Sequence, residues 1–322
     1  MSPLQPGDRL DHYRIDALTA RTSMTTIYRG TDVRTGQVVA IKVPHPEMEC
    51  DPQFFSRFQR EAEIGRKLDH PSVAKVVANG DLSRVCIVME WADGKGLRHL
   101  LAEQGKLPAE RAARIAIGIC DALEYIHGQG IVHRDLKPEN IMVDAEDHIK
   151  LIDFGIAASA GARRLTFSKF SNTLGTPDYI SPEQVKGKRG DARCDVYALG
   201  VILYEMLTGK VPFEGPNPFA VMNDRLLNNP IPPREANPEV SPEMQEIIYR
   251  ALEREPSKRY ASAREVAEDL KHPEKVGVAD REEHRNWKQR RAPASRMIWY
   301  YAMLVTIPLT IIALLLYFAL KK

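Results

Sequence analysis

The chain has 322 residues, of which 43% are apolar, and its formal net charge is +2. This length and composition allow one or two compact units with a large core and exclude a disordered protein. The near balance of charge excludes a global basic field, so we expect no nucleic acid partner. The four cysteines form neither a CxxC pair nor a metal-binding spacing, which indicates reduced thiols in a cytosolic setting.

The N-terminal part of the sequence predicts a small, strand-rich unit. Residues 13–43 alternate short apolar runs with turns and end in the period-2 run QVVAIKV, which is typical of strands. Asp51 and the proline after it predict a helix start, and the helix that follows places Glu61 on the same face as two phenylalanines. The run VCIVMEW at 85–91 predicts a buried strand.

Helical patterns predominate after Gly94 and Gly96. Pro108 predicts the start of a long helix that ends near Gly128. Four later signals mark helix boundaries: Asn217 and Ser241, each followed by proline, the capping box from Ser262 to Glu265, and Gly209 at a helix C-terminus. The sequence therefore predicts a larger helical unit after the first one.

Residues 297–320, MIWYYAMLVTIPLTIIALLLYFAL, carry no charge. At 1.5 Å per residue, a helix of this length can cross a ~30 Å hydrocarbon core. Aromatic residues near both ends and Lys321 and Lys322 beyond the run suit the two membrane interfaces. We therefore predict one transmembrane helix, with a buried core helix as the alternative.

A basic linker, residues 272–296, precedes this run, and its second half is dominated by Arg and Lys. Such a bias places the preceding chain on the cytoplasmic side and offers contacts to anionic lipid headgroups, although a plain solvated linker is equally compatible. With only two residues after the run, we expect a single-pass tail anchor and no extracellular domain.

Residues suited to phosphoryl transfer gather in two motifs. The segment IVHRDLKPENIMV contains Asp135, Lys137 and Asn140, and Asp153 follows in IDFG. Transfer from a nucleotide needs a carboxylate that orients a hydroxyl, oxygen ligands for Mg²⁺, and positive charge on the phosphates. Asp135 suits the first role, Asn140 with Asp153 the second, and Lys42 with Lys137 the third.

Four motifs in order, VAIK, HRDLKPEN, DFG and GTPDYISPE, resemble those of eukaryotic-type protein kinases, and among them the bacterial membrane-anchored Ser/Thr kinases. The resemblance covers roughly residues 13–271. It implies an α+β bilobal kinase fold with a β-rich N-lobe at 13–92 and a helical C-lobe at 93–271. It also implies ATP and Mg²⁺ as cofactors and Ser or Thr of a protein as substrate.

The resemblance assigns the catalytic roles by position. Lys42 holds the α- and β-phosphates and pairs with Glu61; Glu63 is the rival, but it lies on a different side of the helix. Asp135 is the catalytic base, and Lys137 steadies the γ-phosphate. The metal ligands are Asn140 and Asp153. In the adenine site, Met89 is the gatekeeper, Glu90 and Ala92 offer backbone groups, and Ala40 and Met142 sandwich the ring.

The nucleotide loop departs from the family pattern G-x-G-x-x-G-x-V. Aligning Ile27 with the valine places Ala20, Thr22 and Thr25 at the glycine positions, and Leu18 one residue early, which predicts a bulge. A β-carbon obstructs close approach of the backbone to phosphate, so we expect a weaker grip on ATP. Hydroxyls that could bond phosphate instead are those of Thr22, Ser23, Thr25 and Thr26.

The segment 153–183 resembles an activation segment, and Arg134 is the residue that pairs with it when it is phosphorylated. Its candidate autophosphorylation sites are Thr166, Ser168, Ser171 and Thr173. Ordinary loop hydroxyls are the alternative, and the sequence favours Ser171 and Thr173 only weakly.

Other matching positions are structural. Glu183 resembles the glutamate that pairs with a buried arginine, here Arg259, and Asp195 resembles the aspartate that anchors the catalytic loop. Thr176, together with Lys137, favours Ser/Thr over Tyr as the acceptor.

The intact base and metal ligands predict an active Ser/Thr kinase at the cytoplasmic face of a membrane, a bacterial inner membrane from the resemblance. The glycine-free loop supports the alternative, a low-activity or pseudokinase scaffold; a small-molecule phosphotransferase is a third. A homodimer is left open.

Overall fold

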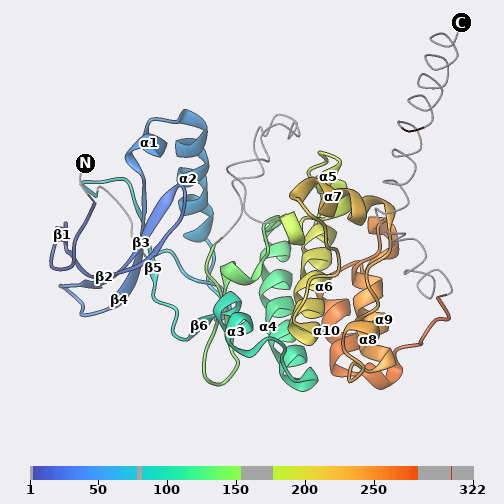
Figure 1. Cartoon of the computed structure of the whole chain (residues 1–322). Helices are drawn as coiled ribbons and strands as arrows, with labels where there is room; N and C mark the ends of the chain where they lie inside the picture. The colour runs from blue at the N-terminus through green and yellow to red at the C-terminus, as the bar shows by residue number, and fades with distance from the viewer. Residues whose placement is uncertain (1–2, 78–81, 154–176, 282–305, 307–322) are drawn as a thin grey trace, which may run out of the picture.

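The computed structural model describes residues 3–77, 82–153, 177–281 and 306 (Figure 1). The predicted transmembrane run at 297–320 lies outside these residues apart from Thr306, and the basic linker is described only to Arg281. Among the helices that the structure describes, none combines the length and apolar character needed to span a membrane. Thr166, Ser168, Ser171 and Thr173 also fall outside the described residues.

An antiparallel five-stranded sheet forms the N-lobe, in the order β1-β2-β3-β4-β5. Its strands are β1 Arg9–Leu10, β2 Tyr13–Arg21, β3 Thr25–Asp32, β4 Val38–Pro44 and β5 Ile87–Glu90. Alternate side chains of these strands point to one face, where they form a core that includes Ile15, Tyr28, Ile41 and Val88. The predicted strand run at 13–43 and the strand within 85–91 are confirmed.

Two helices complete this lobe, α1 Pro46–Glu49 and α2 Pro52–Gly65. The carboxylate of Asp51 accepts hydrogen bonds from two free amides of the first turn of α2, at 2.8 and 3.2 Å, which confirms the predicted cap. The buried face of α2 carries Phe58, Glu61 and Gly65. Because Phe58 packs with Met89 in an apolar cluster, the helix is held so that Glu61 faces inward.

The C-lobe is mainly helical and surrounds α6, which is buried along nearly its whole length (Figure 1). Its helices are α3 Leu97–Gln104, α4 Ala109–Gly128, α5 Pro182–Val185, α6 Arg193–Thr208, α7 Pro218–Leu227, α8 Pro233–Ala236, α9 Pro242–Ala251 and α10 Ala263–Lys271. Short 3₁₀ turns are η1 Pro138–Asn140, η4 Pro177–Tyr179, η5 Pro256–Lys258 and η6 Pro273–Lys275. A second sheet consists of β6 Lys95–Gly96, β7 Ile141–Val143 and β8 Ile149–Leu151.

The predicted helix boundaries in this lobe are largely confirmed. The side chains of Asn217 and Ser241 cap α7 and α9, and Gly209 ends α6 with a left-handed φ of 72°. At α10 the amide of Glu265 donates to the Ser262 hydroxyl at 3.3 Å. The carboxylate of Glu265 accepts from the amide of Ala261 instead of completing the capping box.

The two lobes are joined by the chain between β5 and β6 and also by backbone hydrogen bonds elsewhere. Leu151 on β8 forms a parallel bridge with Val73, and its amide and carbonyl bond Ser72 and Ala74 at 2.9 and 2.8 Å. In the chain between β5 and β6, Gly94 has a φ of 100°, and a β-carbon at this position would lie 2.1 Å from the carbonyl oxygen of Val143. Only glycine fits this close crossing of the two backbones.

Candidate active site

Lys42 lies on β4 and joins the two lobes through its ammonium group. Its Nζ donates to Glu61 Oε1 at 2.7 Å and to Asp153 Oδ1 at 2.9 Å. The structure therefore brings Glu61 to Lys42, whereas Glu63 is exposed on α2. Three segments far apart in sequence meet at one buried cation.

The Lys42 ammonium donates to both carboxylates of this cluster, and the pKa values of Glu61 and Asp153 are shifted in opposite directions. Burial raises the pKa of Glu61 to about 8, and the nearby Asp153 charge adds to this effect against the attraction of Lys42. Burial also opposes ionisation of Asp153, but the Lys42 ammonium and a hydrogen bond from the Glu61 carboxyl together lower the pKa of Asp153 to about 2. An ionised Asp153 is what a divalent cation requires of a ligand.

Asp195, which is buried on α6, fixes the backbone of the catalytic loop, residues 133–140. Its carboxylate accepts the backbone amides of His133 at 2.8 Å and Arg134 at 2.7 Å. His127 Nε2 lies 2.8 Å from the same group. Burial alone would raise the pKa of Asp195, but the hydrogen bond from His127 and neighbouring positive charge lower it. Arg134 takes a strained φ of 65°, which these bonds hold in place.

The loop presents Asp135, Lys137 and Asn140 together. Asp135 is exposed, and its Oδ2 accepts from Lys137 Nζ at 2.7 Å. Asn140 Nδ2 donates to the carbonyl of Asp135 at 2.9 Å, and the carbonyl of Asn140 accepts the amide of Ile152 at 3.0 Å. This last bond ties the loop to the residue before Asp153.

The oxygen donors present suit a magnesium ion. Asn140 Oδ1 accepts no hydrogen bond from the residues that the structure describes, because the amide nitrogen makes the structural contact. Together with the ionised Asp153 it offers the amide and carboxylate oxygens that Mg²⁺ prefers. We conclude that this donor set fits the metal implied by the motifs.

The residues predicted to hold adenine lie at the junction of the lobes. Met89 on β5 is buried and pairs with Ala40 on β4, while Met142 lies on β7. The amide of Glu90 donates to the Lys75 carbonyl at 2.9 Å, so it is not available to a nucleotide. The backbone groups left for that role are the carbonyl of Glu90 and those of Ala92.

The side chain of Glu90 makes a further link between the lobes. Its Oε1 accepts from Lys150 Nζ on β8 at 2.6 Å and from the amide of Lys75 at 3.1 Å. Glu90 belongs to β5 of the N-lobe and Lys150 to the C-lobe.

The nucleotide loop is a tight hairpin between β2 and β3. Its pairing shifts between Leu18 and Ala20, with Leu18 opposite Tyr28 and Ala20 opposite Ile27, which confirms the predicted bulge. The hydroxyl of Thr22 accepts from the amide of Thr25 at 3.0 Å and closes the turn.

The hydroxyls of this loop are used mainly within the protein. Thr25 and Thr26 are buried, and Thr26 Oγ1 lies 3.1 Å from His45 Nε2. Thr22 and Thr25 bond each other at 3.1 Å. The expectation that these groups face phosphate is therefore wrong for Thr25 and Thr26, because the sheet buries them. Within the described chain, Ser23 alone of the four is exposed and without a hydrogen-bond partner.

Several structural contacts of the site were missed from the sequence. Arg225 on α7 is fully buried and donates to the carbonyls of Pro177 and Asp178, both at 2.6 Å. An arginine on a helix ordinarily indicates a solvated face, so no pattern signalled this role. Arg259 and Glu183, paired in the resemblance, form two bonds at 2.8 and 2.7 Å.

Comparison with known families decides the assignment. Residues 21–273 match the protein kinase domain. The chain belongs to the protein kinase family. A probable serine/threonine-protein kinase of Streptomyces coelicolor is 41% identical to this kinase over 263 residues, which cover 80% of this chain and 39% of that protein. The serine/threonine-protein kinase PknB of Mycolicibacterium smegmatis is 37% identical over 270 residues, covering 82% of this chain and 43% of its own length. The chain thus spans about two fifths of the length of these relatives.

Solved structures agree with the bilobal fold. The kinase domain of PknI from Mycobacterium tuberculosis superimposes with a TM-score of 0.66 at 26% identity, covering 84% of this kinase and 100% of that chain. Rad53 1-466 in complex with AMP-PNP gives a TM-score of 0.66 at 26% identity, covering 81% of this kinase and 65% of that chain.

Replacing Lys42 should make stability depend more strongly on pH. In Lys42→Met the two carboxyls lose their shared cation, so the pKa of Glu61 rises further above its unfolded value and the pKa of Asp153 rises from its lowered value of about 2. Above about pH 4.5 the unfolded chain then loses protons that the folded state retains, which favours unfolding. The loss in Tm relative to wild type should be larger at about pH 8 than at about pH 5.

The double variant Lys42→Met/Glu61→Gln is the control, because it removes one of the two titrating groups. Its Tm deficit should change less between the two pH values. A Lys42→Met deficit that is equal at both pH values would contradict the shared-cation account.

Proposed function

We propose that this kinase transfers the γ-phosphate of ATP to serine or threonine of a protein substrate, with Mg²⁺ as cofactor. The observation that carries the proposal is the Lys42 ammonium held between Glu61 and Asp153. The names of the similar bacterial proteins and the AMP-PNP in one similar structure support it.

The proposed chemistry follows from charge and position. When bound, Mg²⁺ supplies positive charge on the phosphates, and Asn140 and Asp153 are the residues that would hold it. Lys42 is fixed in the N-lobe and places a second positive charge for the phosphates. Asp135 accepts the proton of the substrate hydroxyl, and Lys137, 2.7 Å from its carboxylate, compensates charge on the γ-phosphate.

A kinase-fold scaffold with little activity is the second candidate. The glycine-free nucleotide loop supports it, because β-carbons at Ala20 and Thr22 restrict approach of the backbone to phosphate. The catalytic groups favour the enzyme, since the Lys42 bridge and the ordered catalytic loop serve no evident purpose in a scaffold.

The central test is phosphate transfer by the full chain in non-ionic detergent micelles. With labelled ATP and Mg²⁺, wild type should phosphorylate itself and a generic basic protein, and Asp135→Asn should reduce the rate at least about 100-fold. Glu63→Gln, which changes an exposed carboxylate on α2, should leave the rate within about twofold of wild type.

Mass spectrometry of the same samples should locate autophosphorylation among Thr166, Ser168, Ser171 and Thr173. Arg134 supports this part of the proposal, because it forms no ion pair with a carboxylate of the described residues. Equal and minimal transfer by wild type and Asp135→Asn would favour the scaffold.

The loop has its own test. Ala20→Gly removes the β-carbon at a position paired with Ile27 without touching the turn bonds, so the KM for ATP should fall about twofold or more. Thr22→Gly removes the hydroxyl that closes the turn and should not improve KM. An unchanged KM in Ala20→Gly would mean that this loop makes no close contact with phosphate.

We also propose that residues 297–320 anchor the kinase in a membrane, with the catalytic domain in the cytoplasm of a bacterium. The uncharged run and the basic residues before it support this arrangement. The full chain expressed in bacteria should stay with membranes after carbonate washing, and external protease should digest the kinase domain only in inverted vesicles. Release by carbonate, or digestion in spheroplasts, would contradict it.

A further inference from the structure

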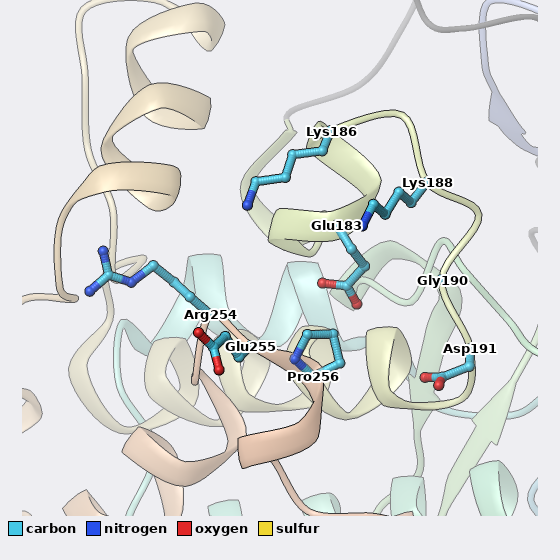
Figure 2. Close-up of a pocket in the computed structure, with 8 residues that line it drawn as sticks. All are labelled: Glu183, Lys186, Lys188, Gly190, Asp191, Arg254, Glu255 and Pro256. Atoms are coloured by element: carbon cyan, nitrogen blue, oxygen red, sulfur yellow. The ribbon is translucent and has the colours of Figure 1, made fainter.

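A cavity of about 500 Å³ lies in the C-lobe, away from Lys42 and Asp153. One wall is α5 and the loop that leads to α6, and the opposite wall is the segment 254–256 after α9 (Figure 2). Figure 2 shows the side chains of Lys186 and Lys188 on the first wall and that of Arg254 on the second.

The acidic residues of this cavity already have partners. Both oxygens of Glu183 are bonded by the Arg259 guanidinium, at 2.8 and 2.7 Å. Asp191 Oδ1 accepts the amide of Arg193 at 2.9 Å, and Glu255 lies 3.5 Å from the ammonium of Lys258. Neighbouring cations therefore compensate the charges of Glu183 and Glu255, whereas Asp191 is bonded only by a neutral amide.

The basic residues are in the opposite situation. Lys186 and Lys188 are exposed and form no ion pair with any carboxylate in the described part of the chain. Arg254 donates to the carbonyl of Leu227 and the side chain of Asn229, both at 2.8 Å, and these neutral acceptors leave its charge uncompensated. Three positively charged side chains thus line a cavity in which Asp191 is the one lining carboxylate without a cationic partner among the described residues.

The wall that carries the lysines is connected to the catalytic loop. The Arg134 guanidinium donates to the carbonyl of Arg189 at 3.2 Å, and Gln184 Nε2 donates to the carbonyl of Arg134 at 3.0 Å. Arg134 directly precedes Asp135, so the cavity and the proposed base are positioned by the same short segment.

We propose that this cavity, the α5–α6 cavity, docks an acidic segment of the protein substrate outside the catalytic residues. The proposal rests on the proposed kinase function and adds a class of substrate to it. Charge complementarity supports the occupant, because glutamate or aspartate side chains would supply the partners that Lys186, Lys188 and Arg254 lack. The volume admits more than one such side chain.

Binding can be measured without catalysis. A fluorescein-labelled peptide with a run of glutamates, and its glutamine counterpart, are titrated by fluorescence anisotropy with the full chain in non-ionic detergent at low salt and without ATP. The glutamate peptide should bind at least about fivefold more tightly than the glutamine peptide. Lys186→Gln/Lys188→Gln should weaken its binding about fivefold or more.

A matched double variant distinguishes the effect of charges in the cavity from the effect of the protein's net charge on peptide binding. Lys271→Gln/Lys275→Gln removes the same charge from α10 and η6, which do not line the cavity, and should change affinity less than about twofold. Equal losses in the two double variants, or equal affinity for the two peptides, would overturn the proposal.

Kinetics test the substrate role. When the glutamate run is joined to a phosphorylatable serine segment, Lys186→Gln/Lys188→Gln should raise KM about fivefold with kcat unchanged. KM for the glutamine version should not change. Specific binding without phosphate transfer to any substrate would contradict the kinase function alone, whereas transfer without specific binding would contradict the docking site alone.

Discussion

The buried ammonium of Lys42 is the contact on which the rest of the site depends. It holds strand β4, helix α2 and Asp153, two residues beyond β8, in one arrangement, because it donates to both carboxylates and favours the ionised form of Asp153. The cap at Asp51 and the apolar face of α2 serve this contact, since they fix the rotation and tilt that bring Glu61 inward.

Asp195 plays the corresponding part in the C-lobe. A buried carboxylate carries a large desolvation cost, which two backbone amides and His127 offset here. The catalytic loop therefore takes its shape from a helix at the centre of the lobe core. Both lobes use a buried charge to determine local geometry, and the reacting groups extend from these rigid points.

Much of this architecture could be predicted from the sequence. Helix caps, the inward face of α2 and the bulge before Ala20 follow from short-range patterns of residue type and spacing. The family motifs located Asp135, Asn140 and Asp153. Position along the chain does not indicate which distant carbonyl or carboxylate needs a donor, so no sequence pattern indicated the roles of Arg225 and His127. For the same reason, the burial of Thr25 and Thr26 by the sheet was not foreseen.

The contact between Glu90 and Lys150 has a mechanical consequence. It lies on the same side of the molecule as the bridge between Val73 and Leu151, so the two lobes are attached along one edge by backbone and side-chain bonds. Sliding or twisting of one lobe over the other would break these bonds, whereas rotation about that edge preserves them. We therefore expect relative motion of the two lobes to be mainly a rotation about this edge.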